Sequence, residues 1–341
     1  MIVGGIPMLF GGAKQQYISV VHSSSPYVTA YPWSSAGFGT KFANPATLPG
    51  VTGRGVTFSP AGTEIAVAHS SSPNVTVYPW SSAGFGTKFA NPATLPSGGG
   101  YAVAFSPAGT ELAVGADGTP FVFAYPWSGA GFGTKFADPA TLPTFSVYGV
   151  AFSPAGTEIA AAHETSPYIA VYPWSGSGFG TKFANPGTLP TGNGFGVAFS
   201  KAGTEIAVGH ATSPYVTIYS WSGAGFGTKF TNPGTLPTGT SFGVAFSKSG
   251  TEIAIASDLT PYVLAYPWSG AGFGIKFTNP ATLPASSAYG VAFSSTNTEI
   301  AVAHSSSPNV TAYPWSSAGF GTKFANPATL PTGAGFAVAF S

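Results

Sequence analysis

Residues 55–96 read GVTFSPAGTEIAVAHSSSPNVTVYPWSSAGFGTKFANPATLP, and this stretch decides the fold. Its tryptophan returns every 47 residues without an insertion, and nearly the same sequence surrounds each copy. A repeat of this length is typical of architectures in which each unit buries its apolar faces only against neighbouring copies. The chain therefore consists of seven repeats of one unit. Each repeat contains one of the tryptophans Trp33, Trp80, Trp127, Trp174, Trp221, Trp268 and Trp315.

Within one unit, apolar residues alternate in short runs that turn residues separate, a pattern that predicts four strands. We expect these strands at Val56–Phe58, Glu64–Ala68, Val75–Tyr78 and Thr87–Ala90, with a flexible loop before the fourth. The first two strands are apolar on both faces, which indicates a sheet covered on both sides. Antiparallel four-stranded sheets stacked around an axis make a β-propeller, so we predict an all-β fold with seven blades. A β-solenoid is the alternative, and the antiparallel turn at residues 60–62 disfavours it.

One predicted inner strand is left without a blade of its own at the carboxyl end, where residues 335–341 read GFAVAFS. We expect Phe336–Phe340 to pair as the inner strand of the first blade, which closes the ring and hides both sheet edges. Seven mutually dependent repeats form one cooperative unit, so we assign residues 13–341 to a single propeller and residues 1–12 to an atypical N-terminal segment.

The composition is poor in charge and rich in turn residues. Only 6% of the residues are charged, and the chain has 47 glycines and 31 prolines. A surface with so little charge repulsion favours a component of an assembly or an extracellular particle. Arg54 is the sole arginine and the net charge is +1, so we expect no nucleic-acid binding. No apolar run approaches the roughly 18 residues of a membrane span, and we expect no membrane insertion.

The segments VAFSPAGTEIAAAH (150–163) and SPYVTIYSW (213–221) resemble WD40 and YVTN-type propeller repeats, which run strand, Ser-Pro-x-Gly turn, strand and apolar strand. The resemblance spans about residues 13–341 and implies the fold. The histidine and aspartate of the WD40 network are missing, and Tyr31-Pro32-Trp33 stands where those repeats have Trp-Asp. The pattern NPATLPTG (326–333) also resembles repeats of bacteriophage structural and tail-associated proteins, and this resemblance implies a virion component that meets the host surface.

Histidine recurs at the end of the second strand in five of the seven units. Packed sheets lie about 10 Å apart, whereas a zinc ion needs ligands at about 2 Å, so equivalent histidines cannot share a metal. We expect a hydrogen bond within each blade, and the alternative is a pH-sensitive contact with a partner. These histidines are His22, His69, His163, His210 and His304, with Ala116 and Ser257 in the other two positions.

The tryptophans lie where the third strand ends, on the face opposite the histidines. We expect them to pack beneath the loop that follows. The alternative is sugar stacking, because equal aromatic sites around a ring would suit a multivalent lectin. The tryptophans and histidines are thus the candidate contacts with partners or glycans.

No pattern in the chain predicts catalysis. Carboxylates are few, no Ser, His and Asp set recurs, and the glycine-rich GFGTK segment lacks the helix that a phosphate-binding loop needs. We therefore expect no enzymatic activity, no cofactor and no metal. The sequence favours a non-enzymatic structural or adhesive propeller, located in a virion or outside the cell, that binds other assembly proteins or host-surface molecules. The alternatives are a multivalent glycan-binding lectin and a cytoplasmic protein-interaction scaffold.

Overall fold

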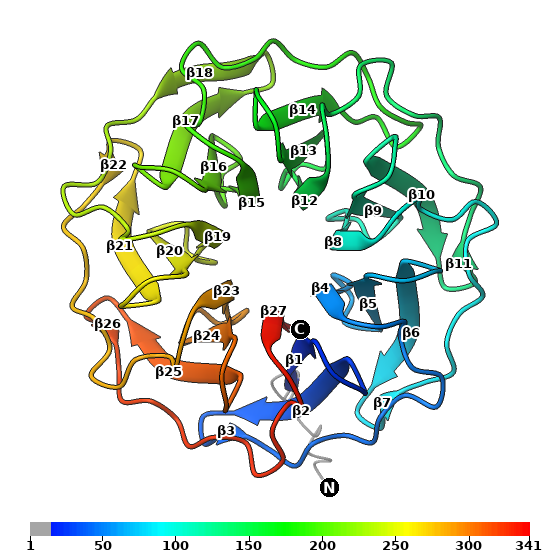
Figure 1. Cartoon of the computed structure of the whole chain (residues 1–341), viewed down its shortest axis with the longest axis vertical. Coiled ribbons are helices and arrows are strands. Elements are labelled where there is room, and N and C mark those ends of the chain that lie inside the picture. Colours follow the sequence, from blue (N-terminus) through cyan, green and yellow to red (C-terminus); the bar gives the residue numbers. More distant parts are fainter. Residues whose placement is uncertain (1–14) are drawn as a thin grey trace, which may run out of the picture.

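The computed structural model describes residues 15–341, which form a ring of seven antiparallel sheets around a central axis (Figure 1). This confirms the predicted all-β, seven-bladed propeller. The proposed segment 1–12 and its boundary with the propeller lie outside the described residues. No helix long and apolar enough to cross a membrane occurs in residues 15–341.

Each blade begins with an inner strand beside the axis, followed by a second strand that is almost entirely buried. The inner strands are β4 (Gly53–Phe58), β8 (Gly100–Phe105), β12 (Val147–Phe152), β15 (Gly194–Phe199), β19 (Ser241–Phe246), β23 (Ala288–Phe293) and β27 (Gly335–Phe340). The second strands are β1 (Gln16–His22), β5 (Glu64–His69), β9 (Glu111–Ala116), β13 (Glu158–His163), β16 (Glu205–His210), β20 (Glu252–Ser257) and β24 (Glu299–His304). We number the blades so that β1 lies in blade 1 and β4 in blade 2.

A third strand carries the tryptophan, and a short outer strand completes the blade. The third strands are β2 (Val28–Ser34), β6 (Val75–Ser81), β10 (Val122–Ser128), β14 (Ile169–Pro173), β17 (Val216–Ser222), β21 (Val263–Ser269) and β25 (Val310–Ser316). The outer strands are β3 (Gly37–Phe38), β7 (Gly84–Phe85), β11 (Gly131–Phe132), β18 (Gly225–Lys229), β22 (Gly272–Phe273) and β26 (Gly319–Phe320). In blade 4 the outer strand is reduced to one bridge between Trp174 and Phe179.

The outer strand differs from its predicted position at Thr87–Ala90. In blade 2 the chain turns back immediately after Ser81, and β7 pairs Trp80 with Phe85 and Ser81 with Gly84. Gly84 has a φ of +95°, a conformation that favours glycine and permits this tight hairpin. The segment predicted as a flexible loop therefore contains the outer strand. Residues 87–90 leave the sheet, although the Phe89 amide still donates to the Val77 carbonyl at 3.0 Å.

The ring closes through its two ends, as predicted. Strand β27 pairs antiparallel with β1, and Ile18 lies opposite Phe340 while Val20 lies opposite Val338. The order of blade 1 is therefore β27-β1-β2-β3, with the last strand of the chain innermost (Figure 1). A strand from the carboxyl end thus covers the edge of the first strand in the described chain.

The inner strands approach one another closely around the axis, which explains the glycine or alanine that follows the second residue of each. A Cβ atom added to Gly55 would lie 2.8 Å from the carbonyl oxygen of Tyr101 in the next blade. Real Cβ atoms do not approach a backbone oxygen so closely without displacing it. Small residues here allow the seven inner strands to form a narrow channel wall.

Candidate ligand site in the central channel

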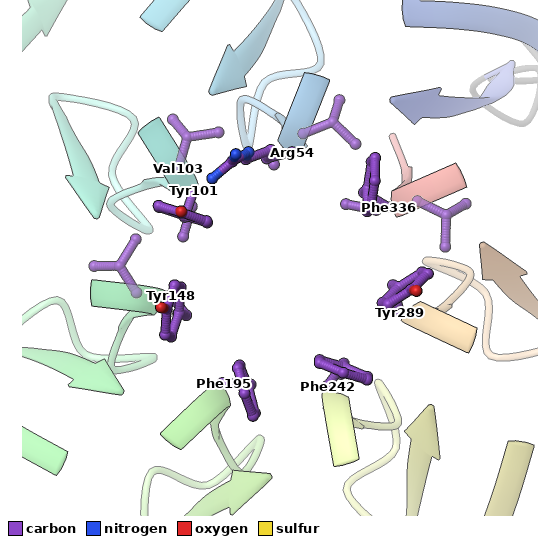
Figure 2. A pocket seen from close by; sticks show the side chains of 18 of the residues that line it. Arg54, Tyr101, Val103, Tyr148, Phe195, Phe242, Tyr289 and Phe336 are labelled. Carbon is purple, nitrogen blue, oxygen red and sulfur yellow. The ribbon is translucent and has the colours of Figure 1, made fainter. Parts of the chain in front are cut away.

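One residue from each inner strand projects into the channel and forms a belt around it (Figure 2). Six are aromatic and the seventh is arginine, although all occupy the same position in the 47-residue repeat. The belt consists of Arg54, Tyr101, Tyr148, Phe195, Phe242, Tyr289 and Phe336.

A β-bulge aims each belt residue at the axis. In blade 2 the pairing passes from Gly53 opposite His69 directly to Gly55 opposite Ala68, so Arg54 has no cross-strand partner. The same shift occurs in the other inner strands. Bulges interrupt the alternation of side chains and are frequent beside binding sites. Regular pairing would direct the side chain of the belt residue against a neighbouring blade. The bulge directs it toward the channel instead.

The belt encloses a cavity of about 590 Å³, whose wall continues with the glycine, alanine and valine residues that follow each belt position. Adjacent aromatic rings touch one another along the belt, with ring centroids 4.7 Å apart for Tyr101 and Tyr148 and 4.8 Å apart for Phe195 and Phe242. This volume suits a small organic molecule. The cavity is therefore lined mainly by aromatic rings, with the charged group of Arg54 beside Tyr101 on one side and the single hydroxyl of Tyr289 on the other.

The polar side is centred on Arg54. Its guanidinium lies over the ring of Tyr101, with Cζ 4.0 Å from the ring centroid, in a cation–π contact. Its Nη1 atom is buried and has no hydrogen-bond partner among residues 15–341. A buried charged donor without an acceptor is costly, which makes this nitrogen a ready partner for an oxygen atom of a ligand.

Tyr148, two blades away from Arg54, extends the polar side. Its hydroxyl donates to Oε2 of half-buried Glu164 at 2.9 Å. Burial first, and then the adjacent carboxylate, raise the pKa of Tyr148 to about 12, so the phenol is neutral at physiological pH. Contacts thus run continuously from Arg54 through Tyr101 and Tyr148 to Glu164, whereas Phe195 and Phe242 lie beyond them in the belt.

The five candidate histidines are fully buried beside the inner strands and do not reach the cavity. Nε2 lies within hydrogen-bond distance of a threonine hydroxyl in the same blade for His69 at 2.8 Å, His210 at 2.9 Å and His304 at 2.8 Å. His22 and His163 instead lie near threonines of the preceding linker, through Nδ1 at 3.4 and 3.2 Å. The contact of Nε2 with a threonine hydroxyl of the same blade is therefore present in three of the five.

Burial lowers the pKa of each of these histidines from 6.5 to about 4. They are therefore neutral at physiological pH. Residues 15–341 contain no group of three or more His, Cys, Asp or Glu side chains that could hold a metal ion.

The seven tryptophans are also buried, with 2–5% of each residue exposed. Trp80 makes edge contacts with Phe85 of its own outer strand, with Phe58 of its inner strand and with Phe42 from the preceding blade, at centroid distances of 5.0, 5.5 and 5.1 Å. These contacts hold neighbouring blades together, and they leave little ring surface for a sugar. The geometry supports the packing interpretation of the tryptophans.

Comparisons with solved structures recover the whole ring at low sequence identity. The periplasmic gluconolactonase of Pseudomonas aeruginosa is 14% identical with a TM-score of 0.69, over 95% of this chain and 99% of that one. A provisionally named 6-phosphogluconolactonase of Bacteroides fragilis is 11% identical with a TM-score of 0.73, over 96% and 98%. Its counterpart in Bacteroides uniformis is 13% identical with a TM-score of 0.70, over 96% and 100%. No protein-family model and no curated protein sequence matches this chain.

These comparisons establish the seven-bladed β-propeller fold and correct two expectations from the sequence. A non-enzymatic structural or adhesive part of a virion was expected, but these three neighbours, which share the whole ring, are named as lactonases. None of these three names points to a bacteriophage. The expectation of no enzymatic activity is wrong for the same reason. It rested on the absence of a repeated catalytic set, yet a site on the axis takes a different residue from each blade.

Sequence analysis missed every residue of the belt. The signal that could have found it is the replacement of an aromatic residue by Arg54 at a fixed repeat position, 47 residues before Tyr101. In a chain whose repeats are nearly identical, one charged residue in an otherwise aromatic position marks the place where the symmetry is broken.

Proposed function

We propose that this propeller binds small lactones in the belt cavity and hydrolyses them to the open-chain acids. The buried, unpartnered Nη1 of Arg54 in an otherwise aromatic cavity is the observation that carries the proposal. The names of the structural neighbours support the choice of a lactone as the substrate class. The cavity volume of about 590 Å³ accommodates a single sugar-sized ring.

In this proposal Arg54 donates a hydrogen bond to the lactone carbonyl oxygen, and the aromatic belt holds the ring of the substrate. Negative charge grows on that oxygen as the acyl carbon is attacked. A fixed donor aimed at the place where charge develops stabilises this charge. Arg54 is suited to the role because its guanidinium is always charged and Tyr101 holds it in place.

Tyr148 and Glu164 would move the proton of the attacking water. The water oxygen bonds to the acyl carbon while its proton passes to the Tyr148 oxygen, and the phenol proton passes to Oε2 of Glu164 at 2.9 Å. The ring C–O bond of the lactone then breaks. Its oxygen takes the proton back by the same route, which gives a free hydroxyl and a carboxylic acid. The carboxylic acid then releases its own proton to the solvent, and the product leaves as a carboxylate.

Replacing Arg54 tests the proposal directly. For Arg54→Ala we expect kcat/KM for glucono-δ-lactone to fall about 10²–10³-fold, the loss typical of one removed oxyanion donor. Arg54→Lys should recover only part of this rate, because an ammonium group cannot reproduce the planar fork. The measurement is acid release in a pH-stat, corrected for spontaneous hydrolysis.

The control is Lys41→Ala, since Lys41 lies on the outer side of blade 1 and its Nζ contacts Asn44 at 2.6 Å. This variant should keep the wild-type rate. Wild-type protein that does not exceed spontaneous hydrolysis for any sugar lactone would refute the proposed reaction. A rate that Arg54→Ala leaves unchanged would refute the proposed site.

A pair of tyrosine variants tests the proton route. Tyr148 and Tyr289 occupy the same belt position, but among the described residues only the Tyr148 hydroxyl bonds to a carboxylate, that of Glu164. We expect Tyr148→Phe to lower kcat about 10²-fold, within the usual range for a positioned proton-transfer group, with little change in KM. Tyr289→Phe should have a much smaller effect. Equal losses of kcat in the two variants would exclude a special role for the hydroxyl of Tyr148.

A further inference from the structure

The end of the channel where the inner strands begin, here called the mouth, breaks the repeat symmetry a second time. One position of each unit directly follows the second strand on this side of the ring. It holds serine in blades 1, 2 and 7 and alanine in blade 5. In blades 3, 4 and 6 the same position holds a carboxylate, that of Asp117, Glu164 or Asp258.

Each of these carboxylates lies beside the residues that lead into the inner strand of its own blade. The backbone amides of Asp117, Glu164 and Asp258 donate at 3.1 Å to the carbonyls of Gly99, Ser146 and Thr240, respectively. Each acceptor stands two residues before a belt position. The side chains stay at the same place, because Asp117 Oδ1 accepts from the Gly99 amide at 2.5 Å and Glu164 Oε2 accepts from the Tyr148 hydroxyl at 2.9 Å. The three carboxylates therefore lie close above the belt.

No ion pair neutralises these carboxylates within residues 15–341, where the one ion pair joins Lys135 and Asp138. The hydrogen bonds to Asp117 and Glu164 come from neutral groups, an amide and a phenol, which leave both carboxylates charged. Oδ1 of Asp258 is buried and has no hydrogen-bond partner in the described chain. Arg54 is the one charged side chain that lines the cavity (Figure 2). One positive charge against three negative charges leaves the mouth and belt together at −2.

The other charged side chains of the described residues lie away from the mouth. Lys201 and Lys248 occupy turns at the opposite end of the channel, together with the six glutamates that open second strands. The remaining lysines follow the outer strand of each blade, and each contacts an Asn or Asp three residues on. An outer strand lies roughly 14 Å from the inner strand of its blade, at about 4.8 Å per strand. Salt screens charges over about 8 Å, so these lysines do little to offset the mouth.

We propose that the mouth selects uncharged lactones for the belt cavity and disfavours phosphorylated ones, an inference that rests on the proposed lactone hydrolysis. A phosphate monoester carries about −1.5 to −2 charge at pH 7, and the three carboxylates repel it. Arg54 cannot hold a phosphate while it donates to the lactone carbonyl. An uncharged ring meets no such repulsion. The same negative charge favours release of the product, which leaves as an anion.

Comparison of glucono-δ-lactone with its 6-phosphate tests the selectivity. We expect kcat/KM to be about 10²-fold higher for the uncharged lactone at low ionic strength. Several pairs of like charges act together, and one such pair at about 4 Å in water changes an equilibrium about fivefold. Added salt should reduce this ratio, because it screens the repulsion. Equal kcat/KM for the two lactones, or a preference for the phosphate ester, would overturn the proposal.

The double variant Asp117→Asn, Asp258→Asn removes two of the charges and leaves Glu164 and the proton route in place. It should raise kcat/KM for the phosphate ester about tenfold and change that for glucono-δ-lactone less than about twofold. The matched control is Asp138→Asn, which copies the other six units and removes a carboxylate from the outer part of the ring. This control should leave the ratio between the two lactones unchanged. A double variant that behaves like the control would show that the mouth carboxylates do not set the selectivity.

Binding of the open-chain acids separates a failure of this inference from a failure of the proposed reaction. Calorimetry with gluconate and 6-phosphogluconate should show weaker binding of the phosphorylated acid to wild type. The double variant should narrow this difference about tenfold, whether or not any lactone is hydrolysed. A protein that shows this pattern without hydrolysis refutes the reaction and supports the selectivity of the mouth. Hydrolysis with the same affinity difference in wild type and double variant refutes the role of the mouth and leaves the reaction standing.

Discussion

Removing residues 335–341 is expected to abolish the cooperative folding of the ring. The deletion takes away β27, the inner strand of blade 1, and leaves the edge of β1 unpaired. It also removes buried Val338 and the ring of Phe340, which contacts Trp33 at a centroid distance of 5.4 Å. Each such apolar side chain contributes about 1.5–3 kcal/mol, and the whole stability of a typical domain is only about 5–15 kcal/mol. Losing the strand and the closure together should therefore unfold the protein or lower Tm drastically.

Circular dichroism and calorimetry of the truncated chain measure this effect. A synthetic peptide with the sequence of residues 332–341 provides the control, because it should pair with β1 and restore part of the lost Tm. Val338→Ala gives a graded comparison, since it removes packing while the strand stays in place. If the truncated chain melts at the wild-type temperature, β27 does not close the ring.

Acid is expected to unfold the protein between about pH 6.5 and pH 4. The five histidines have their pKa lowered to about 4 by burial, whereas an unfolded histidine titrates near 6.5. The unfolded chain therefore binds more protons than the folded chain within this window. The contribution of the five neutral histidines to the unfolding free energy is fully present above pH 6.5 and decreases as the pH falls toward 4. Below pH 4 these histidines cause no further change in stability.

The size of this effect is large because five histidines act together. One pKa unit corresponds to about 1.4 kcal/mol, so each histidine can remove up to about 3 kcal/mol of stability. Losing several such contributions would exceed the stability of a typical domain. We expect Tm to fall steeply across this window, with an uptake of nearly one proton per histidine on unfolding.

The chain itself provides the control variant. Blade 3 has Ala116 and Phe123 where blade 2 has the hydrogen-bonded pair His69 and Thr76. The double variant His69→Ala, Thr76→Phe copies blade 3 and should take up close to one proton fewer on acid unfolding. Proton uptake follows from the slope of unfolding free energy against pH. An uptake that is the same in both proteins would show that His69 is not a source of acid sensitivity.

Much of the fold could be predicted because the same pattern of apolar and turn residues occurs in each of the seven units. Alternating apolar residues located the inner, second and third strands, and the unmatched segment at the carboxyl end located β27 in blade 1. The outer strand was misplaced because its pairing depends on a hairpin at Gly84, where backbone conformation matters more than apolar alternation. Two residues carry too little periodicity to be recognised as a strand.

The belt could not be predicted by the same means. Its residues lie 47 positions apart and meet only because the ring brings the inner strands together. Each sits at a β-bulge, so the alternation that locates a strand assigns its side chain to the wrong face. The histidines and tryptophans were predicted as candidate contacts because they recur in the repeats. In this chain, however, residues that recur in every unit are packing residues. Arg54, which does not recur, is the better indicator of a site.

We expect an oxygen atom of the ligand to contact Arg54 inside the belt. Arg54 is the sole arginine of the chain, so uniformly ¹⁵N-labelled protein gives a single arginine side-chain Nε resonance. Titration with gluconate, the open-chain product of the proposed reaction, should move this resonance in a saturable way, and Tyr101→Ala should weaken the response by removing the ring that holds the guanidinium. A resonance that stays in place throughout the titration, in wild type, would contradict the account.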